Sequence, residues 1–321
     1  MTTEATPRRP LALLPLDLVR GFLIGLAELV PGVSGGTVAL VTGVYEQLIS
    51  SASHVLSAIK RLVVGPDRWS GFREEARRTD WMLIGPVLVG MATAVLSVAG
   101  AMEGFVSDHP EHARGLFLGL VAASVVVPLR MLPARAAEPW WADVALVVVA
   151  AGAAWGLVGL ASGREVTDPP LWAVFLAAAV AICALVVPGV SGSFFLLAVG
   201  LYSTTLAAVD ERDLLYVAVF AAGALTGLAS FVRVLEWALT SHRRITLLVM
   251  AGLMIGSLRA LWPWQSSAGP DDEAHGAGAL LAPTGPVAGP LLLLGLGVVV
   301  VAVMVLVEIR ATRQAEQAER A

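Results

Sequence analysis

The sequence predicts an all-α polytopic membrane protein whose two halves form an inverted repeat of a re-entrant hairpin and three transmembrane helices. Three observations lead to this prediction. First, 57% of the residues are hydrophobic and only 14% are charged, whereas about a quarter of the residues in a typical soluble domain are charged. Second, apolar runs long enough to cross a bilayer recur along the chain. Third, one unusual segment occurs twice.

The repeated segment is the strongest evidence for duplication. Residues 28–45 read ELVPGVSGGTVALVTGVY, and residues 185–202 read LVVPGVSGSFFLLAVGLY. At an offset of 157 residues, both share a Pro-Gly-Val-Ser-Gly turn and, further on, Gly43/Gly200 and Tyr45/Tyr202. A weaker similarity relates GLVAAS at 119–124 to GLMIGS at 252–257. We interpret the pattern as an internal duplication.

Each repeated turn interrupts an apolar stretch and so predicts a broken hairpin. The first has arms at 16–30 and 33–49, and the second at 171–187 and 189–208. An arm of about 15 residues is roughly 22 Å long as a helix, which is shorter than a hydrocarbon core of about 30 Å. Irregular backbone at that depth is tolerated only where protein or a polar cavity covers it. Each hairpin is therefore expected to be re-entrant or a pair of broken spans.

The remaining elements follow in order. Residues 54–80 predict an amphipathic piece followed by a charged loop. Six full spans are expected at 81–103, 115–131, 141–161, 213–238, 245–263 and 288–308. The chain is then a single membrane domain, 1–321, with repeat one at 16–165 and repeat two at 170–310.

The number of spans and the basic residues predict the orientation. A hairpin leaves the chain on the same side of the membrane, but three spans carry it across, so the second repeat is expected to be inverted, as in many secondary transporters. Sixteen Lys and Arg residues fall in the segments on one face and only three (Arg114, Arg164 and Arg212) on the other. By the positive-inside rule, both termini are expected to be cytoplasmic; that the membrane is a bacterial cytoplasmic (inner) membrane is implied only by the family resemblance described below.

Two facing helix breaks predict an anion site. We expect the amides at 33–36 and 190–193 to be unpaired donors at helix N-termini, with hydroxyl groups nearby. Such a site prefers a carboxylate or phosphate. Alternatively, the Gly and Ser residues simply permit close helix packing. The candidate substrate-binding residues are Glu28, Pro31, Gly32, Ser34, Gly35, Gly36, Thr37, Pro188, Gly189, Ser191, Gly192, Ser193 and Arg259.

Ionisable residues in apolar runs are costly and are often functional. Glu28 has two interpretations: it accepts a proton coupled to transport, or it binds the amides of the turn. Arg259 contacts an anionic head group or extends to the interface beside Trp262. Arg233 and Glu236, three residues apart, are expected to pair with each other.

Enzymatic chemistry is not expected. The Gly-x-Ser-x-Gly pattern at 32–36 resembles a serine nucleophile motif, but all five histidines fall in predicted loops or at their edges. Asp108, His109, Glu111 and His112 fit a solvated loop better than a metal site. We therefore expect no catalytic residue, no metal site and no cofactor.

The segments AELVPGVSGGTVALVTGVYEQLI, LVVPGVSGSFFLLAVGLY and GSLRALWPW resemble the bacterial polyprenyl-phosphate (undecaprenyl-phosphate) transporter family of PopT type, formerly a domain-of-unknown-function membrane family. The resemblance implies translocation of undecaprenyl phosphate from the outer to the inner leaflet for recycling in cell-wall biogenesis. The phosphate would be held at the paired breaks while the prenyl tail stays in lipid.

One departure is Ser193, where the first copy has Gly36, so the two half-sites are unequal. The expected partner is a polyprenyl-phosphate lipid and not nucleic acid, and a homo-oligomer is compatible with the sequence. Two other interpretations stay open, a secondary carrier of a small organic anion and an intramembrane serine hydrolase.

Overall fold

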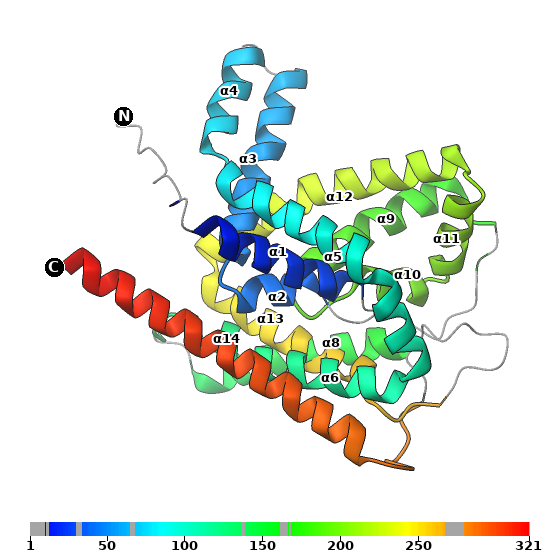
Figure 1. The fold of residues 1–321 in the computed structure, drawn as a ribbon. Coiled ribbons are helices and arrows are strands. Elements are labelled where there is room, and N and C mark those ends of the chain that lie inside the picture. Colours follow the sequence, from blue (N-terminus) through cyan, green and yellow to red (C-terminus); the bar gives the residue numbers. More distant parts are fainter. Residues whose placement is uncertain are drawn as a thin grey trace.

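The computed structural model describes residues 10, 13–29, 34–64, 68–135, 139–160, 166, 168–266 and 279–320. The fold is all-α (Figure 1). The first half contains α1 (Leu14–Glu28), α2 (Gly35–Val41), α3 (Tyr45–Val64), α4 (Arg68–Arg78), α5 (Trp81–Asp108), α6 (Pro110–Ser124), α7 (Val126–Arg130) and α8 (Trp140–Leu160). The second half contains α9 (Leu171–Val186), α10 (Gly192–Ala198), α11 (Tyr202–Asp210), α12 (Leu214–Ser241), α13 (Arg243–Ser257), the 3-10 helix η2 (Leu258–Leu261) and α14 (Ala288–Arg320).

The predicted polytopic architecture is confirmed. Within the described residues, six stretches are long and apolar enough to cross a membrane. They are Trp81–Val98, Pro110–Arg130, Trp140–Gly159, Leu214–Ser241, Arg243–Leu261 and Ala288–Val307. Each overlaps one of the six predicted spans, and the kink between α6 and α7 lies inside the second.

The two hairpins have short first arms and divided second arms. Helices α1 and α9 contain 15 and 16 residues. The prediction of one continuous helix for each second arm is wrong, because α2 is separated from α3, and α10 from α11. The separations contain Gly43 and Gly200, whose φ angles are +73° and +74°. Glycine adopts this left-handed conformation without a Cβ clash, and it ends each helix after seven residues.

The predicted charged loop before the first span is also wrong, because most of it forms α4. Helices α3 and α4 form an antiparallel pair that extends away from the bundle (Figure 1). Ion pairs join them, from Arg61 to Glu74 at 3.0 Å and to Glu75 at 2.9 Å, and His54 Nδ1 lies 2.9 Å from Glu75 Oε2. These contacts explain how such a polar segment remains helical.

Four close helix pairs build the bundle, and glycine allows each approach. A Cβ added at Gly90 of α5 would collide with the Leu18 carbonyl oxygen of α1. The same collision recurs between Gly223 of α12 and Phe175 of α9. Small residues favour helix association in membranes because they let backbones come into van der Waals contact.

The other two pairs join the halves. Gly119 of α6 packs on the Leu294 carbonyl of α14, and Gly252 of α13 packs on the Val147 carbonyl of α8. The weak similarity between GLVAAS and GLMIGS therefore marks equivalent packing positions. In these contacts residue numbers increase together along both partners, so all four pairs are parallel.

The arrangement in Figure 1 places several basic segments together. Helix α5 runs from left to right and α12 from right to left. The start of α1, the α3–α4 pair, the start of α13 and the end of α14 all lie on the left.

Two adjacent arginines at the start of α13 make interhelical ion pairs at this end. Arg243 lies 2.7 Å from Glu46 of α3, and Arg244 lies 2.5 Å from Asp143 of α8.

Candidate functional site

The two hairpins contact each other directly inside the bundle. The Tyr45 hydroxyl donates to the Val186 carbonyl at 3.0 Å, and the Gly189 amide donates to Thr37 Oγ1 at 3.1 Å. Ser34 Oγ lies 3.3 and 3.4 Å from the carbonyl oxygens of Leu185 and Val187. Residues about 150 positions apart in the sequence therefore meet at one place.

In this contact the first hairpin contributes side chains and the second contributes backbone. The absence of a side chain at Gly36 makes the approach close, since a Cβ there would lie 2.8 Å from the Val186 carbonyl oxygen. Ser34 and Thr37 are each only 2% exposed. Their hydroxyl groups therefore form buried hydrogen bonds with backbone groups of the second hairpin.

Glu28 binds the turn of its own hairpin. The Gly35 amide donates to Glu28 Oε1 at 2.9 Å. This contact agrees with the interpretation that Glu28 binds the amides of the turn. The expectation of unpaired amides is thus wrong at Gly35. It is also wrong at Val190, whose amide donates to the Val187 carbonyl at 3.2 Å. Local contacts satisfy these donors because the chain turns back on itself at each break.

The glycines of the repeated turns permit close packing. At Gly189 φ is +83°, and a Cβ would lie 2.5 Å from the Met254 backbone. A Cβ at Gly192 would lie 2.6 Å from the Ala181 carbonyl oxygen, and one at Gly35 would collide with the Glu28 carboxylate. At these three positions glycine is needed for close packing, which agrees with the alternative that the glycines of the motif permit close helix approach.

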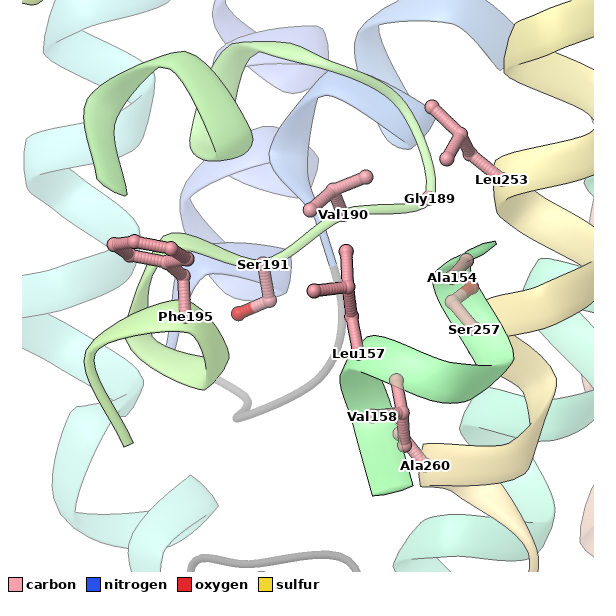
Figure 2. A pocket seen from close by; sticks show the side chains of 10 residues that line it. All are labelled: Ala154, Leu157, Val158, Gly189, Val190, Ser191, Phe195, Leu253, Ser257 and Ala260. Atoms are coloured by element: carbon pink, nitrogen blue, oxygen red, sulfur yellow. The ribbon is translucent and has the colours of Figure 1, made fainter. Parts of the chain in front are cut away.

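A pocket of about 70 Å³ lies on the α10 side of the hairpin contact (Figure 2). Its wall comes from the turn at Gly189–Ser191, from α8, from α10 and from the α13–η2 segment. Ser191 Oγ, which lines the pocket, is 2.9 Å from Ser193 Oγ. Ser257 lines it from α13 and donates to the Met254 carbonyl at 2.8 Å. The hydroxyl groups of Ser191 and Ser257 and the backbone of the turn are thus the polar groups of an otherwise apolar pocket.

Arg259 lies next to this pocket without lining it. Its guanidinium group donates to the Trp155 carbonyl at 3.1 Å and packs 5.4 Å from the centroid of the Trp155 ring. Its Nε is buried and has no hydrogen-bond partner within the described residues.

The remaining predictions concern Arg233 with Glu236, and three residues of the repeated turns. Arg233 donates to Ser57 Oγ at 3.4 Å, and no ion pair joins it to Glu236 on the described α12, so their predicted pairing is wrong. Pro188 is fully buried beside the contact. Pro31 and Gly32 lie outside the described residues.

Sequence reasoning missed Tyr45 and Ser257 as residues of this region. Both belong to patterns that recur in the two halves, the Gly-x-Tyr at 43–45 and 200–202 and the similarity of 119–124 to 252–257. Those recurrences were available as a guide. What they could not provide was the partner of each side chain, which depends on how the halves pack.

These features define a class of protein: a polytopic helical membrane protein in which two broken hairpins meet within the bundle. The chain belongs to the VCA0040-like family, described as undecaprenyl phosphate translocase-like, whose sequence profile matches residues 24–278. The resemblance noted from the sequence is thereby confirmed.

Two relatives agree with this assignment. The chain is 32% identical over 253 residues to a polyprenyl-phosphate transporter of Vibrio cholerae, covering 78% of each chain. It is 27% identical over 262 residues to a polyprenyl-phosphate transporter of Staphylococcus aureus, covering 77% of this chain and 86% of the relative. Both are named as transporters, in agreement with a protein that is not an enzyme. No solved structure matches the fold.

Proposed function

We propose that this protein translocates undecaprenyl phosphate from the outer to the inner leaflet of the cytoplasmic membrane, so that the lipid carrier is recycled for cell-wall synthesis. The observation that carries the proposal is the direct contact of the two hairpins, at Tyr45–Val186 and Thr37–Gly189, within a set of apolar spans. Broken helices that meet inside a membrane protein commonly form substrate sites. The names of the two relatives supply the lipid class.

Alternating access around the hairpin contact is the proposed mechanism. It is supported by the opposite directions of α5 and α12 in Figure 1 and by the recurrence of the Gly90–Leu18 contact as Gly223–Phe175. Both features are expected of an inverted repeat. The grouping of basic segments at one end of Figure 1 supports cytoplasmic termini.

In this proposal the phosphate binds on the α10 side of the contact. Ser191 and Ser193 offer hydroxyl groups there, and Ser257 lies across the same pocket. Arg259 is the adjacent cation, and its buried Nε retains an unused donor. Charge-assisted hydrogen bonds to phosphate are about twice as strong as neutral ones, so one reoriented guanidinium would contribute substantially.

Glu28 is the residue we propose for proton coupling, since its carboxylate lies next to the first repeated turn and binds that turn directly. Proton uptake there would weaken its hold on the Gly35 amide and so link protonation to the shape of the hairpin.

Transport by reconstituted vesicles tests the proposal. Purified protein in vesicles loaded on one leaflet with polyprenyl phosphate should equalise the lipid between leaflets, whereas neutral polyprenol should not move. An imposed pH gradient should change the rate for the wild type but not for Glu28→Gln. Equal movement of the phosphate and the alcohol would contradict phosphate recognition. A rate independent of the pH gradient would remove the coupling while leaving translocation intact.

A further inference from the structure

A second pocket lies on the α2 side of the hairpin contact and is much larger. Its volume is about 210 Å³, against about 70 Å³ for the pocket beside α10. It is bounded by α1, α2, α5, α6 and α14, and its lining is apolar apart from Thr37 and Ser124. The Ser124 hydroxyl already donates to the Leu120 carbonyl at 2.6 Å. The pocket therefore offers almost nothing to a polar ligand.

The two pockets occupy equivalent places in the two halves. Ser124 and Ser257 end the similar segments 119–124 and 252–257, and each lines its own pocket. Val38 lines the larger pocket where, 157 residues later, Phe195 lines the smaller one. The replacement of a phenyl ring by an isopropyl group is one reason for the difference in volume.

The hydrogen bond between Gly189 and Thr37 joins residues that line the two pockets. Thr37 lines the larger pocket and Gly189 lines the smaller one, and the Gly189 amide donates to Thr37 Oγ1. A ligand with a polar end and an apolar end could therefore place its ends on opposite sides of this bond. The larger pocket also reaches the outer face of α14, because its lining residue Val300 is 39% exposed on a helix that crosses the membrane.

We infer that the larger pocket binds the first isoprene units of a polyprenyl chain, with the remaining chain leaving past Val300 into the lipid. The inference rests on the proposed function for the identity of the ligand. An apolar cavity of about 150 Å³ accommodates benzene, so a pocket of about 210 Å³ has room for roughly two branched five-carbon units. The β-branched and aromatic side chains of its wall match a methyl-branched chain.

The experiment measures the affinity of purified protein for three probes. Farnesyl phosphate has a branched chain, dodecyl phosphate has a straight chain of the same main-chain length, and farnesol lacks the phosphate. The wild type should bind farnesyl phosphate more tightly than either of the others. Val300→Phe places a ring at the exposed mouth of the pocket, and Val38→Phe places in it the side chain found at the equivalent position of the other half.

Both variants should weaken farnesyl phosphate binding by about tenfold or more, the order of discrimination that an apolar pocket achieves against a misfit. Val299→Phe is the matched control, because Val299 is 57% exposed on the same helix and does not line the pocket; its affinity should equal that of the wild type. Because Val300 is exposed, Val300→Phe should fold even if Val38→Phe does not.

The outcomes separate the two proposals. Equal affinity of Val300→Phe and Val299→Phe, or equal affinity of the wild type for farnesyl and dodecyl phosphate, would overturn the isoprenoid site. If farnesol bound as tightly as farnesyl phosphate and Val300→Phe weakened both, the isoprenoid site would stand and phosphate recognition would fail. If no prenyl compound bound, both proposals would be overturned.

Discussion

The two hairpins share a sequence motif and a geometry, yet they play different parts in the contact between them. Each ends its second helix at a left-handed glycine, Gly43 or Gly200, with φ angles one degree apart. In the first hairpin, however, side-chain oxygens make the contact, and in the second the backbone accepts or donates. Two hairpins with the same sequence motif thus differ in role, because side chains of the first bind the backbone of the second.

Three differences in sequence explain this division. At equivalent positions the first hairpin has Glu28 where the second has Leu185, Thr37 where it has Phe194, and Gly36 where it has Ser193. Glu28 holds the first turn and Thr37 holds the second turn. Ser193 instead pairs with Ser191 beside the smaller pocket. The first hairpin thus makes the structural hydrogen bonds, and we propose that the second makes the ligand contacts.

The largest expected effect comes from closing the approach between the hairpins. Gly189→Ala adds a Cβ at φ +83°, 2.5 Å from the Met254 backbone, so both backbone strain and overpacking should lower the free energy of unfolding, by about 3 kcal/mol in total. Denaturation in detergent measures the change. The matched control is Gly85→Ala, where nothing lies within 4 Å of the added Cβ and a small gain in helix stability is expected. Equal stabilities of the two variants would show that the turn is not packed against α13.

A smaller effect is expected from Thr37→Val, which removes the acceptor of the Gly189 amide while conserving shape. Leaving this buried donor unpaired should cost about 1–3 kcal/mol of unfolding free energy. Ser191→Ala, which removes a hydroxyl group that lines the smaller pocket, should instead weaken binding of polyprenyl phosphate. Measuring both quantities for both variants tests the division of labour, and the reverse pattern would assign the ligand to the first hairpin.

The two ends of the bundle can be compared in the same way. Arg244 binds Asp143 at 2.5 Å, and Arg135 lies 2.7 Å from the same carboxylate. In the equivalent helix pair, α6 with α14, the corresponding positions are Glu111 and Pro290, which cannot form an ion pair. Asp143→Asn should lower the unfolding free energy, since hydrogen bonds to charged groups are stronger than neutral ones. A double-mutant cycle with Arg244→Gln measures the coupling. Additive effects would mean that the ion pair contributes nothing.

The smallest expected change in stability is that of Glu28→Gln. The amide oxygen can still accept from Gly35, so the unfolding free energy should change by no more than about 0.5 kcal/mol. Glu28→Ala removes the acceptor and should cost about 1–3 kcal/mol. Thermal unfolding of the two variants side by side separates the hydrogen bond from the charge, and a severe loss in Glu28→Gln would show that the ionised carboxylate itself holds the turn.

Much of the architecture could be predicted from the sequence, because a helix that crosses a membrane requires a long run of apolar residues. The six spans and the short arms of both hairpins follow from length and hydropathy. The division of each second arm did not, although Gly43 and Gly200 were visible as a matched pair, because a glycine reveals its left-handed conformation only in the folded chain. Helix α4 was missed because its ion pairs with α3 require both helices to be in place.

The site shows the same limit. The residues of the hairpin contact could be recognised from the repeated turn, and the interpretation of the repeat as a duplication led us to expect that they converge. The partner of each group could not be recognised, since the bonds from Tyr45 to Val186 and from Gly189 to Thr37 join residues 141 and 152 positions apart. Arg259 was grouped with the turns by its charge, but its contacts are with Trp155.

Thermal stabilisation by the lipid tests whether the phosphate head group binds at the second hairpin. Polyprenyl phosphate should raise the unfolding temperature of the wild type well above the effect of neutral polyprenol. The difference should disappear in the Ser191→Ala, Ser193→Gly variant, with each shift measured against the same variant without ligand. If polyprenyl phosphate and polyprenol stabilised the wild type equally, or if the variant kept the full preference for the phosphate, the second hairpin would not be the place where the head group binds.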